Sequence, residues 1–99
     1  MNKQLVQFNF TGMTVQQYGN VMDELQRDSP YVKGRIHHVS CIKGNDIQVI
    51  GVWESREAFD NFFNQTLTPL FSRHGLRLVQ PTILPVHYEY SGVEANVSH

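Results

Sequence analysis

Polar and apolar residues alternate at the start of the chain. Within residues 3–10, the side chains of Val6, Phe8 and Phe10 fall on one side and polar Asn9 falls on the other. A period of two is typical of a β-strand. The sequence therefore predicts a first strand over 3–10 with an apolar face and a more polar one.

The period then changes to that of a helix. Thr14 can cap the first turn, and Gln17 three residues later completes a capping box. Apolar residues follow at helical spacing and predict one buried stripe, formed by Tyr18, Val21, Met22 and Leu25. The run Asp28–Pro30 ends this helix, because the residue before a proline disfavours the helical conformation.

Two runs rich in β-branched residues, 35–42 and 47–54, flank the turn 43–46 and predict a β-hairpin. The turn sets a register in which residue 42 pairs with 47, 40 with 49, 38 with 51 and 36 with 53. His38 then lies beside Gly51 on one face. Both faces of the hairpin are largely apolar, so we expect both to be covered.

A second helix begins at Ser55, which can cap it. Its apolar stripe is long and mostly aromatic, with Phe59, Phe62, Phe63, Leu67, Leu70 and Phe71. Pro69 removes a backbone donor and predicts a break between Leu67 and Leu70. Thr68 would cap the short piece that follows, and Gly75 would close it.

The last strand is predicted over residues 82–90, and Pro85 places it at a sheet edge. The order strand, helix, strand, strand, helix, strand predicts one α+β domain over residues 1–90, with 91–99 as a loose tail. Two helices cover only one face of a four-stranded sheet, so the other face needs a partner. A second copy of the chain is the commonest partner, which predicts a homodimer.

Composition narrows the function classes. A chain of 99 residues with 40% apolar residues forms one globular domain. Eight basic residues against nine acidic ones give a net charge of −1, which argues against nucleic acid or an anionic membrane as a partner. A single cysteine, no signal-like apolar run and no stretch of about 20 apolar residues predict a cytoplasmic protein.

The segment VIGVWESREAFDNFFNQTLTPLF, followed by PVHYEY, resembles the dimeric α/β-barrel domains related to antibiotic biosynthesis monooxygenases. The resemblance covers roughly Lys3 to Tyr90, and the VWES-x-x-AF part is its most specific motif. It implies a ferredoxin-like subunit whose four-stranded antiparallel sheet pairs with that of a second subunit to form a barrel. It identifies the fold better than the activity, because one fold serves many functions.

The same superfamily includes cofactor-independent quinone-forming monooxygenases, haem-degrading monooxygenases, and small decarboxylases and isomerases. The haem-degrading branch resembles this chain at Asn9 only. Phe62 stands where that branch has a tryptophan, and His74 lies past Pro69 and out of register with its histidine. The resemblance therefore implies no haem and no other cofactor.

Several residues are candidates for a site. His38 and His87 are candidate proton-transfer residues, because neutral imidazole exchanges protons near neutral pH. The candidate substrate-binding residues are Asn9, Gly51, Trp53, Phe62 and Tyr88. The alternative for each histidine is a packed side chain with one hydrogen bond, and for the aromatic residues it is core or interface packing. No metal site is predicted, since His37 and His38 point to opposite faces.

Three function classes remain on the sequence alone. The leading hypothesis is a dimer with an apolar pocket in each subunit that binds a small aromatic or polyketide-like molecule and oxidises it without metal or flavin. The second is a non-enzymatic ligand-binding or regulatory dimer with the same pocket. The third is a ferredoxin-like RNA-binding module, which the charge balance disfavours.

Overall fold

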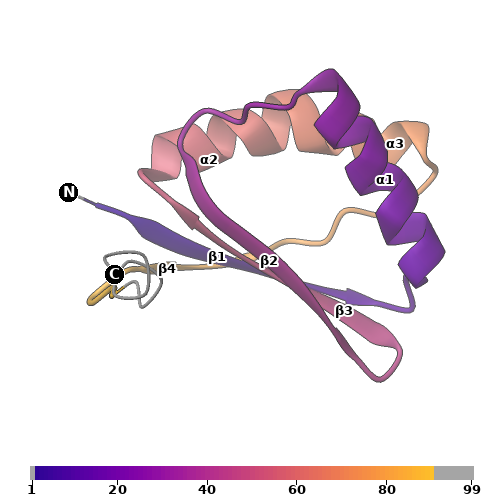
Figure 1. Cartoon of the computed structure of the whole chain (residues 1–99), viewed down its shortest axis with the longest axis horizontal. Coiled ribbons are helices and arrows are strands. Elements are labelled where there is room, and N and C mark those ends of the chain that lie inside the picture. Colours follow the sequence, from indigo (N-terminus) through magenta and orange to yellow (C-terminus); the bar gives the residue numbers. More distant parts are fainter. Residues whose placement is uncertain (1, 91–99) are drawn as a thin grey trace, which may run out of the picture.

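The computed structural model describes residues 2–90, and their elements follow the predicted order (Figure 1). These elements are β1 (Gln4–Thr11), α1 (Val15–Asp28), β2 (Arg35–Lys43), β3 (Asp46–Trp53), α2 (Arg56–Phe62), a π-helical turn (Phe63–Leu67), α3 (Thr68–Arg73) and β4 (Thr82–Pro85). Within the described residues the strands form one antiparallel sheet in the order β2-β3-β1-β4. The predicted α+β, ferredoxin-like fold is confirmed. The tail predicted at 91–99 lies outside the described residues.

The start of α1 follows the sequence closely. The Thr14 side chain accepts a hydrogen bond from the Gln17 backbone N–H at 3.0 Å, and the Gln17 side chain accepts one from the Thr14 N–H at 2.9 Å. This capping box satisfies two backbone donors that the first turn leaves free. Val21 and Leu25 of the predicted stripe are buried, so the helix lies with its apolar side toward the core.

The hairpin has the predicted register over most of its length. Residue 42 pairs with 47, 40 with 49 and 38 with 51. The predicted pair of Ile36 with Trp53 is wrong, because the register shifts between Arg35 and His37 and places Arg35 opposite Trp53. A bulge of this kind adds one unpaired residue and changes which face the side chains beyond it occupy. Arg35 therefore shares the helix-covered face with Trp53.

The break predicted at Pro69 takes another form. The backbone stays helical through Leu67 (φ −71°, ψ −44°) and Thr68 (φ −60°, ψ −49°), so the expected non-helical cap at Thr68 is wrong. A π-helical turn precedes the proline instead, in which the Thr68 N–H donates to the Phe63 carbonyl. The Thr68 hydroxyl donates to the same carbonyl at 2.8 Å. The wider π-helical turn accommodates Pro69, whose ring crowds the preceding helical turn and whose backbone nitrogen has no hydrogen to donate.

Gly75 closes α3, as predicted. Its φ of +67° is one that glycine adopts without a steric penalty. The Gly75 N–H donates to the Ser72 carbonyl and the Leu76 N–H to the Phe71 carbonyl, each at 3.0 Å. This pair of bonds is the Schellman motif that closes many helices.

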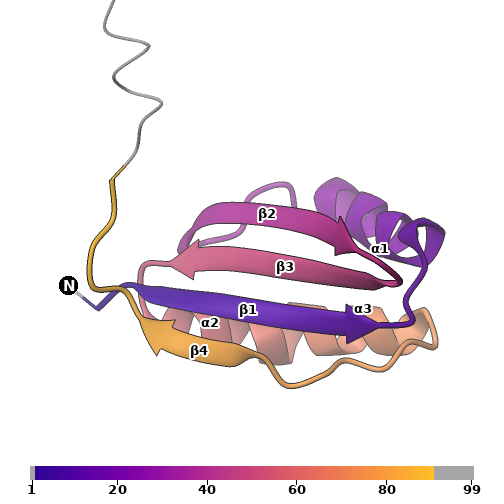
Figure 2. The ribbon, with the colours of Figure 1, turned by 90° about the horizontal axis from the view of Figure 1, so that it is seen from below.

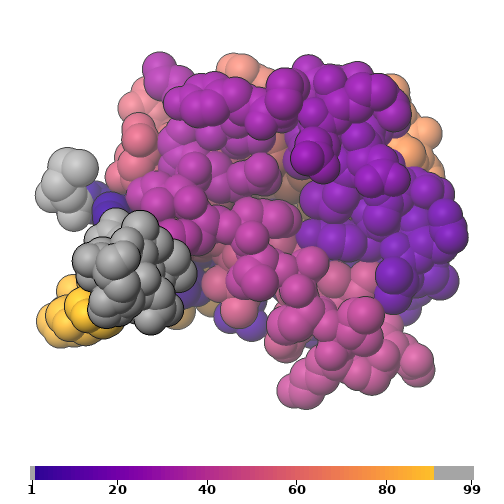
Figure 3. All heavy atoms as spheres, viewed as in Figure 1, coloured from indigo at the N-terminus to yellow at the C-terminus, as the bar shows by residue number. Residues whose placement is uncertain are grey.

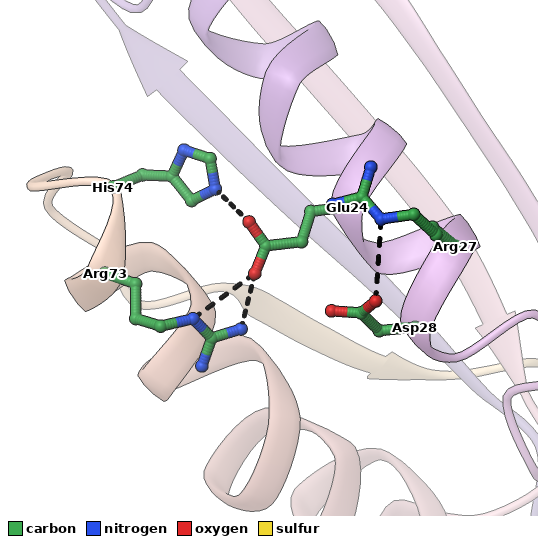
Figure 4. Close-up of polar contacts among 5 residues, drawn as sticks. All are labelled: Glu24, Arg27, Asp28, Arg73 and His74. Atoms are coloured by element: carbon green, nitrogen blue, oxygen red, sulfur yellow. Dashed lines mark hydrogen bonds and ion pairs between the residues drawn. The ribbon is translucent and has the colours of Figure 1, made fainter.

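An ionic bridge on the surface joins α1 to the end of α3 (Figure 4). One carboxylate oxygen of Glu24 accepts from Arg73 Nη2 at 2.7 Å, and the other is 2.8 Å from His74 Nε2. The hydrogen bonds from Arg73 and then His74 hold the Glu24 pKa below its ordinary value. His74 is thereby engaged on the helix side of the molecule and takes no part in lining the cavity described below.

The last strand is shorter than predicted. β4 ends at Pro85, which pairs with Gln4 near the start of β1, so residues 86–90 do not continue the strand. β1 offers no further residues to pair with, and the Val86 N–H makes one more bond to the Lys3 carbonyl at 2.9 Å. The prediction that Pro85 lies on an edge strand is confirmed by the strand order.

Among residues 2–90, the helices all lie on one side of the sheet and no element covers the opposite face, which is called the bare face below (Figure 2). That bare face carries a group of exposed or half-buried apolar side chains: Leu5, Val39, Ile50, Val52 and Leu84. Val39 is 58% exposed and Leu84 is 53% exposed. The expectation that both faces are covered is therefore unmet by one copy of the chain. Within residues 2–90, no helix is long and apolar enough to cross a membrane.

Candidate functional site

A small cavity lies between the sheet and the helices. Its volume is about 40 Å³, which is room for a few water molecules at about 10–15 Å³ each. The wall is mostly apolar and aromatic. Four of the residues predicted from the sequence line it, namely His38, Gly51, Trp53 and Phe62.

A wider groove of about 480 Å³ runs between α1 and β2 and adjoins the cavity. The atoms of these two elements lie side by side on one face of the molecule, with the surface hollowed between them (Figure 3). Three polar residues line both the groove and the cavity: Tyr18, Arg35 and His38. They form the boundary between an open, partly polar entrance and an apolar interior.

Tyr18 and His38 approach one another across this boundary. The Tyr18 hydroxyl is 3.3 Å from His38 Nε2 and can donate to it or accept from it, depending on which ring nitrogen carries the proton. Desolvation lowers the pKa of His38 from its ordinary value, and the nearby Arg35 charge lowers it further. His38 is still an exposed residue of the single chain, so we expect this shift to be modest. The imidazole is therefore predominantly neutral at neutral pH.

The Tyr18 phenol is also held in its neutral form. Burial raises the pKa of Tyr18, while a hydrogen bond from Ser40 and the Arg35 charge oppose that rise to a smaller extent. A neutral phenol beside a neutral imidazole can relay a proton between the imidazole and a bound molecule. The pair thus combines a base with a hydrogen-bonding group at one position in the wall.

Arg35 supplies the charge in this part of the wall. It is half-buried, and desolvation lowers the pKa of its guanidinium. No aspartate or glutamate among the residues that the structure describes lines either the cavity or the groove. Among residues 2–90, none of the ion pairs includes Arg35.

Trp53 forms the aromatic wall of the cavity. It is 3% exposed, and its ring packs edge-on against Phe59 at 5.4 Å between centroids and tilted against Phe62 at 5.2 Å. A Cβ at Gly51 would lie 3.2 Å from the indole Nε1 and 3.3 Å from the His37 carbonyl oxygen. The indole therefore fills the space over Gly51, which was predicted as a substrate-binding residue, and the cavity lies beside it.

The remaining predicted residues lie elsewhere. Asn9 is exposed and pairs with Gln48 on the bare face of the sheet, whereas its neighbours Phe8 and Phe10 line the cavity. The alternation of the strand thus separates Asn9 from His38. His87 and Tyr88 follow β4 and are exposed, Tyr88 by 79%, and neither lines the cavity of the single chain.

Sequence reasoning missed Arg35 as a site residue. A strict period of two places it with His37 on the bare face, and only the bulge at Ile36 turns it to the other side. Tyr18 was predicted as part of the buried stripe of α1, and its spacing could not indicate contact with His38. Within the described residues, no group of three or more His, Cys, Asp or Glu side chains is arranged to hold a metal ion.

No protein-family model matches this chain, and no curated protein matches its sequence. Solved structures do share its fold. SnoaB, a cofactor-independent oxygenase from Streptomyces nogalater, is similar with a TM-score of 0.66 at 14% identity, over 89% of this chain and 95% of that one. A candidate antibiotic biosynthesis monooxygenase from Chloroflexus aurantiacus is similar with a TM-score of 0.63 at 12% identity, over 92% of this chain and 98% of that one.

A third similar structure is a monooxygenase from Streptomyces coelicolor in complex with the ligand nanaomycin D. Its TM-score is 0.57 at 13% identity, over 91% of this chain and 89% of that one. At such identities the likeness establishes the fold. The chain has the ferredoxin-like fold of antibiotic biosynthesis monooxygenase-like proteins, as the resemblance of its sequence predicted.

Proposed function

We propose that this protein binds a small aromatic molecule in the cavity beside Trp53 and oxidises it with molecular oxygen, without a metal or a flavin. The observation that carries the proposal is the Tyr18–His38 contact of 3.3 Å at the entrance to an aromatic-walled cavity. An apolar hollow with a few convergent polar groups is the usual form of a small-molecule site. The fold shared with cofactor-independent oxygenases is consistent with it.

The chemistry assigned to the wall is proton abstraction followed by reaction with oxygen. Neutral His38 takes a proton from an activated ring methylene of a hydroxylated aromatic substrate, and the resulting carbanion adds O₂ to form a hydroperoxide. Loss of water then leaves a ketone, so that R₂CH₂ and O₂ become R₂C=O and H₂O. The substrate supplies all four electrons. Tyr18 returns a proton to the departing oxygen through its contact with His38.

A ligand of this class requires more room than the cavity offers. Pockets for such molecules measure about 300–1,000 Å³, whereas the cavity measures about 40 Å³ and the adjoining groove about 480 Å³. We therefore propose that the ligand occupies the groove and inserts one ring past Tyr18 and His38 toward Trp53. Met22, which is half-buried and lines both hollows, is flexible enough to move aside.

The experiment uses Trp53 as a reporter, because it is the only tryptophan of the chain and it lines the cavity. Titration with 1,8-dihydroxyanthraquinone should quench its fluorescence saturably, and 1,8-dihydroxyanthrone should cause oxygen uptake above the buffer rate in the presence of a chelator. Quenching without oxygen uptake would assign the non-enzymatic ligand-binding role. Absence of saturable quenching would overturn the proposal.

We also propose that two copies pair through the bare face of the sheet. Two of the apolar side chains there, Val39 and Leu84, are more than half exposed in the single chain. Burying that face would stabilise the pair by the hydrophobic effect, and a stable interface should remove more than about 1,200 Å² of surface from water. Light scattering at micromolar concentration should give twice the mass of one chain. Val39→Asp should yield monomers, and a monomeric parent protein would contradict the proposal.

A further inference from the structure

Arg35 occupies an unusual position for a cation. It lines the cavity and the groove together with Tyr18 and His38, and it is half-buried. Charged side chains that leave water are normally paired with an opposite charge, because desolvation of an unpaired charge is costly. Within residues 2–90 no ion pair includes Arg35, and neither hollow is lined by an acidic residue.

A β-bulge in β2 places Arg35 on this face of the sheet. Regular alternation along β2 would direct Arg35 to the bare face with His37, but the bulge at Ile36 sets it opposite Trp53. Gly34, just before it, has a φ of +87°, and its carbonyl accepts from the Glu54 N–H at 2.8 Å. The chain is thus held on both sides of Arg35, and the side chain is presented to the cavity by the fold. Bulges next to binding sites commonly re-aim a side chain in this way.

The remaining polar groups of the wall leave this charge uncompensated. Tyr18 is a phenol whose pKa is raised by burial, and His38 is an imidazole whose pKa is lowered by desolvation and by Arg35. Both are therefore predominantly neutral near pH 7. Tyr18, Arg35 and His38 together carry a net charge of about +1 at the edge of the apolar cavity. That arrangement is complementary to a flat molecule that carries one negative charge.

We infer that Arg35 is an anion-binding residue and that the ligand of this cavity is an aromatic carboxylate. The inference rests on the proposed function, since it specifies the class of aromatic molecule that the same site takes. A guanidinium presents parallel N–H groups that match the two oxygens of a carboxylate. Ion pairing at the entrance would orient the ring system with its apolar part toward Trp53. Arg35 thereby selects the substrate, and Tyr18 and His38 act on it.

The test compares two probes that share one ring system, the anion 2-naphthoate and its neutral methyl ester, methyl 2-naphthoate, by calorimetry with the full chain at pH 7.5. The parent protein should bind the acid about tenfold or more tightly than the ester, because hydrogen bonds to charged groups contribute that much. A third probe, 2-naphthol, is neutral at this pH and should bind like the ester. Naphthol binding as tightly as the acid would mean that a hydroxyl suffices, and this would overturn the assignment of a carboxylate.

Arg35→Met should abolish the preference for the acid and leave ester affinity within about twofold, because only the charge interaction is removed. Arg35→Lys keeps the charge without the planar fork and should retain part of the preference. Arg27→Met is the matched control, since Arg27 lies at the exposed end of α1 beside Asp28, at 3.6 Å, and lines neither hollow. It should behave as the parent.

Three results would overturn the inference, and they separate it from the proposed function. Equal affinity of the parent for acid and ester would leave the cavity as an aromatic site and remove the anion role of Arg35. A preference that survives in Arg35→Met would assign the anion to another residue. Failure of every probe to bind would remove both this inference and the proposed function. Ester binding by Arg35→Met serves as the check that this variant is folded.

Discussion

His38→Gln should lower the rate of oxygen uptake by about 10²–10⁴-fold, the usual contribution of a positioned general base. Glutamine keeps a polar group of similar reach but cannot take a proton. Binding of 1,8-dihydroxyanthraquinone should change little, because His38 is one of several residues lining the hollow. The measurement is oxygen uptake with 1,8-dihydroxyanthrone, alongside the Trp53 quenching titration that reports binding separately.

The pH profile provides the sharper readout of the same variant. Because the pKa of His38 is lowered, its imidazole in the parent protein should stay in the base form at pH values below the ordinary pKa of histidine. Activity should then be lost as the pH falls through the lowered pKa. His38→Gln should lack this acidic limb. His87→Gln is the matched control, since His87 is exposed and lies outside the cavity. If His87→Gln lost the activity and His38→Gln kept it, the base would be His87.

Gly51→Val should lower the free energy of unfolding by roughly 1–3 kcal/mol, the usual cost of overpacking a filled site. The reason is that even a Cβ at Gly51 would stand 3.2 Å from the Trp53 indole nitrogen and 3.3 Å from the His37 carbonyl oxygen. The carbonyl belongs to a paired strand and cannot move, so the indole must. We therefore expect an altered Trp53 emission spectrum and weaker anthraquinone binding together with the loss of stability, measured by urea unfolding.

The control for this variant is Gly19→Val on α1. A Cβ at Gly19 meets nothing within 4 Å, and valine has a slightly better helix propensity than glycine. Stability should therefore stay unchanged or rise by a few tenths of a kcal/mol. If Gly51→Val were as stable as Gly19→Val and kept the parent emission spectrum, the indole would not be packed over Gly51.

Much of the fold could be predicted because its signals are local. The capping box at Thr14 and the glycine closure at Gly75 depend on a few neighbouring residues. The hairpin register at 42–47 follows from the turn, which joins strands whose pairing is set within four residues. Sequence position alone also placed Pro85 at an edge, because a residue without an N–H is excluded from a central strand.

The second helix and the last strand depended on more distant groups. Pro69 perturbs the helix as expected, but whether the chain breaks or widens into a π turn depends on how Leu70 and Phe71 are buried beyond it. Both are nearly fully buried, which favours keeping the helix continuous. The length of β4 was decided by where β1 begins, since a strand pairs only as far as its neighbour extends. Neither the form of the helix at Pro69 nor the length of β4 is determined by the residues of the segment itself.

For the site, the sequence by itself determined that His38 lies beside Gly51, near Trp53 and under the aromatic stripe that includes Phe62. Only the tertiary structure decided that Arg35 joins them. Gly34 lies so close to α2 that a Cβ would come within 2.5 Å of the Ala58 side chain. The chain therefore enters β2 from a fixed point.

The extra residue between that fixed point and the predicted hairpin register is absorbed as a bulge at Ile36, which reverses the face of Arg35. The contact of Tyr18 with His38 likewise joins α1 to β2 across 20 residues of sequence. It exists because α1 packs over the sheet. Periodicity predicts which face a side chain occupies within its own element, whereas the contacts between elements are set by how those elements pack against one another.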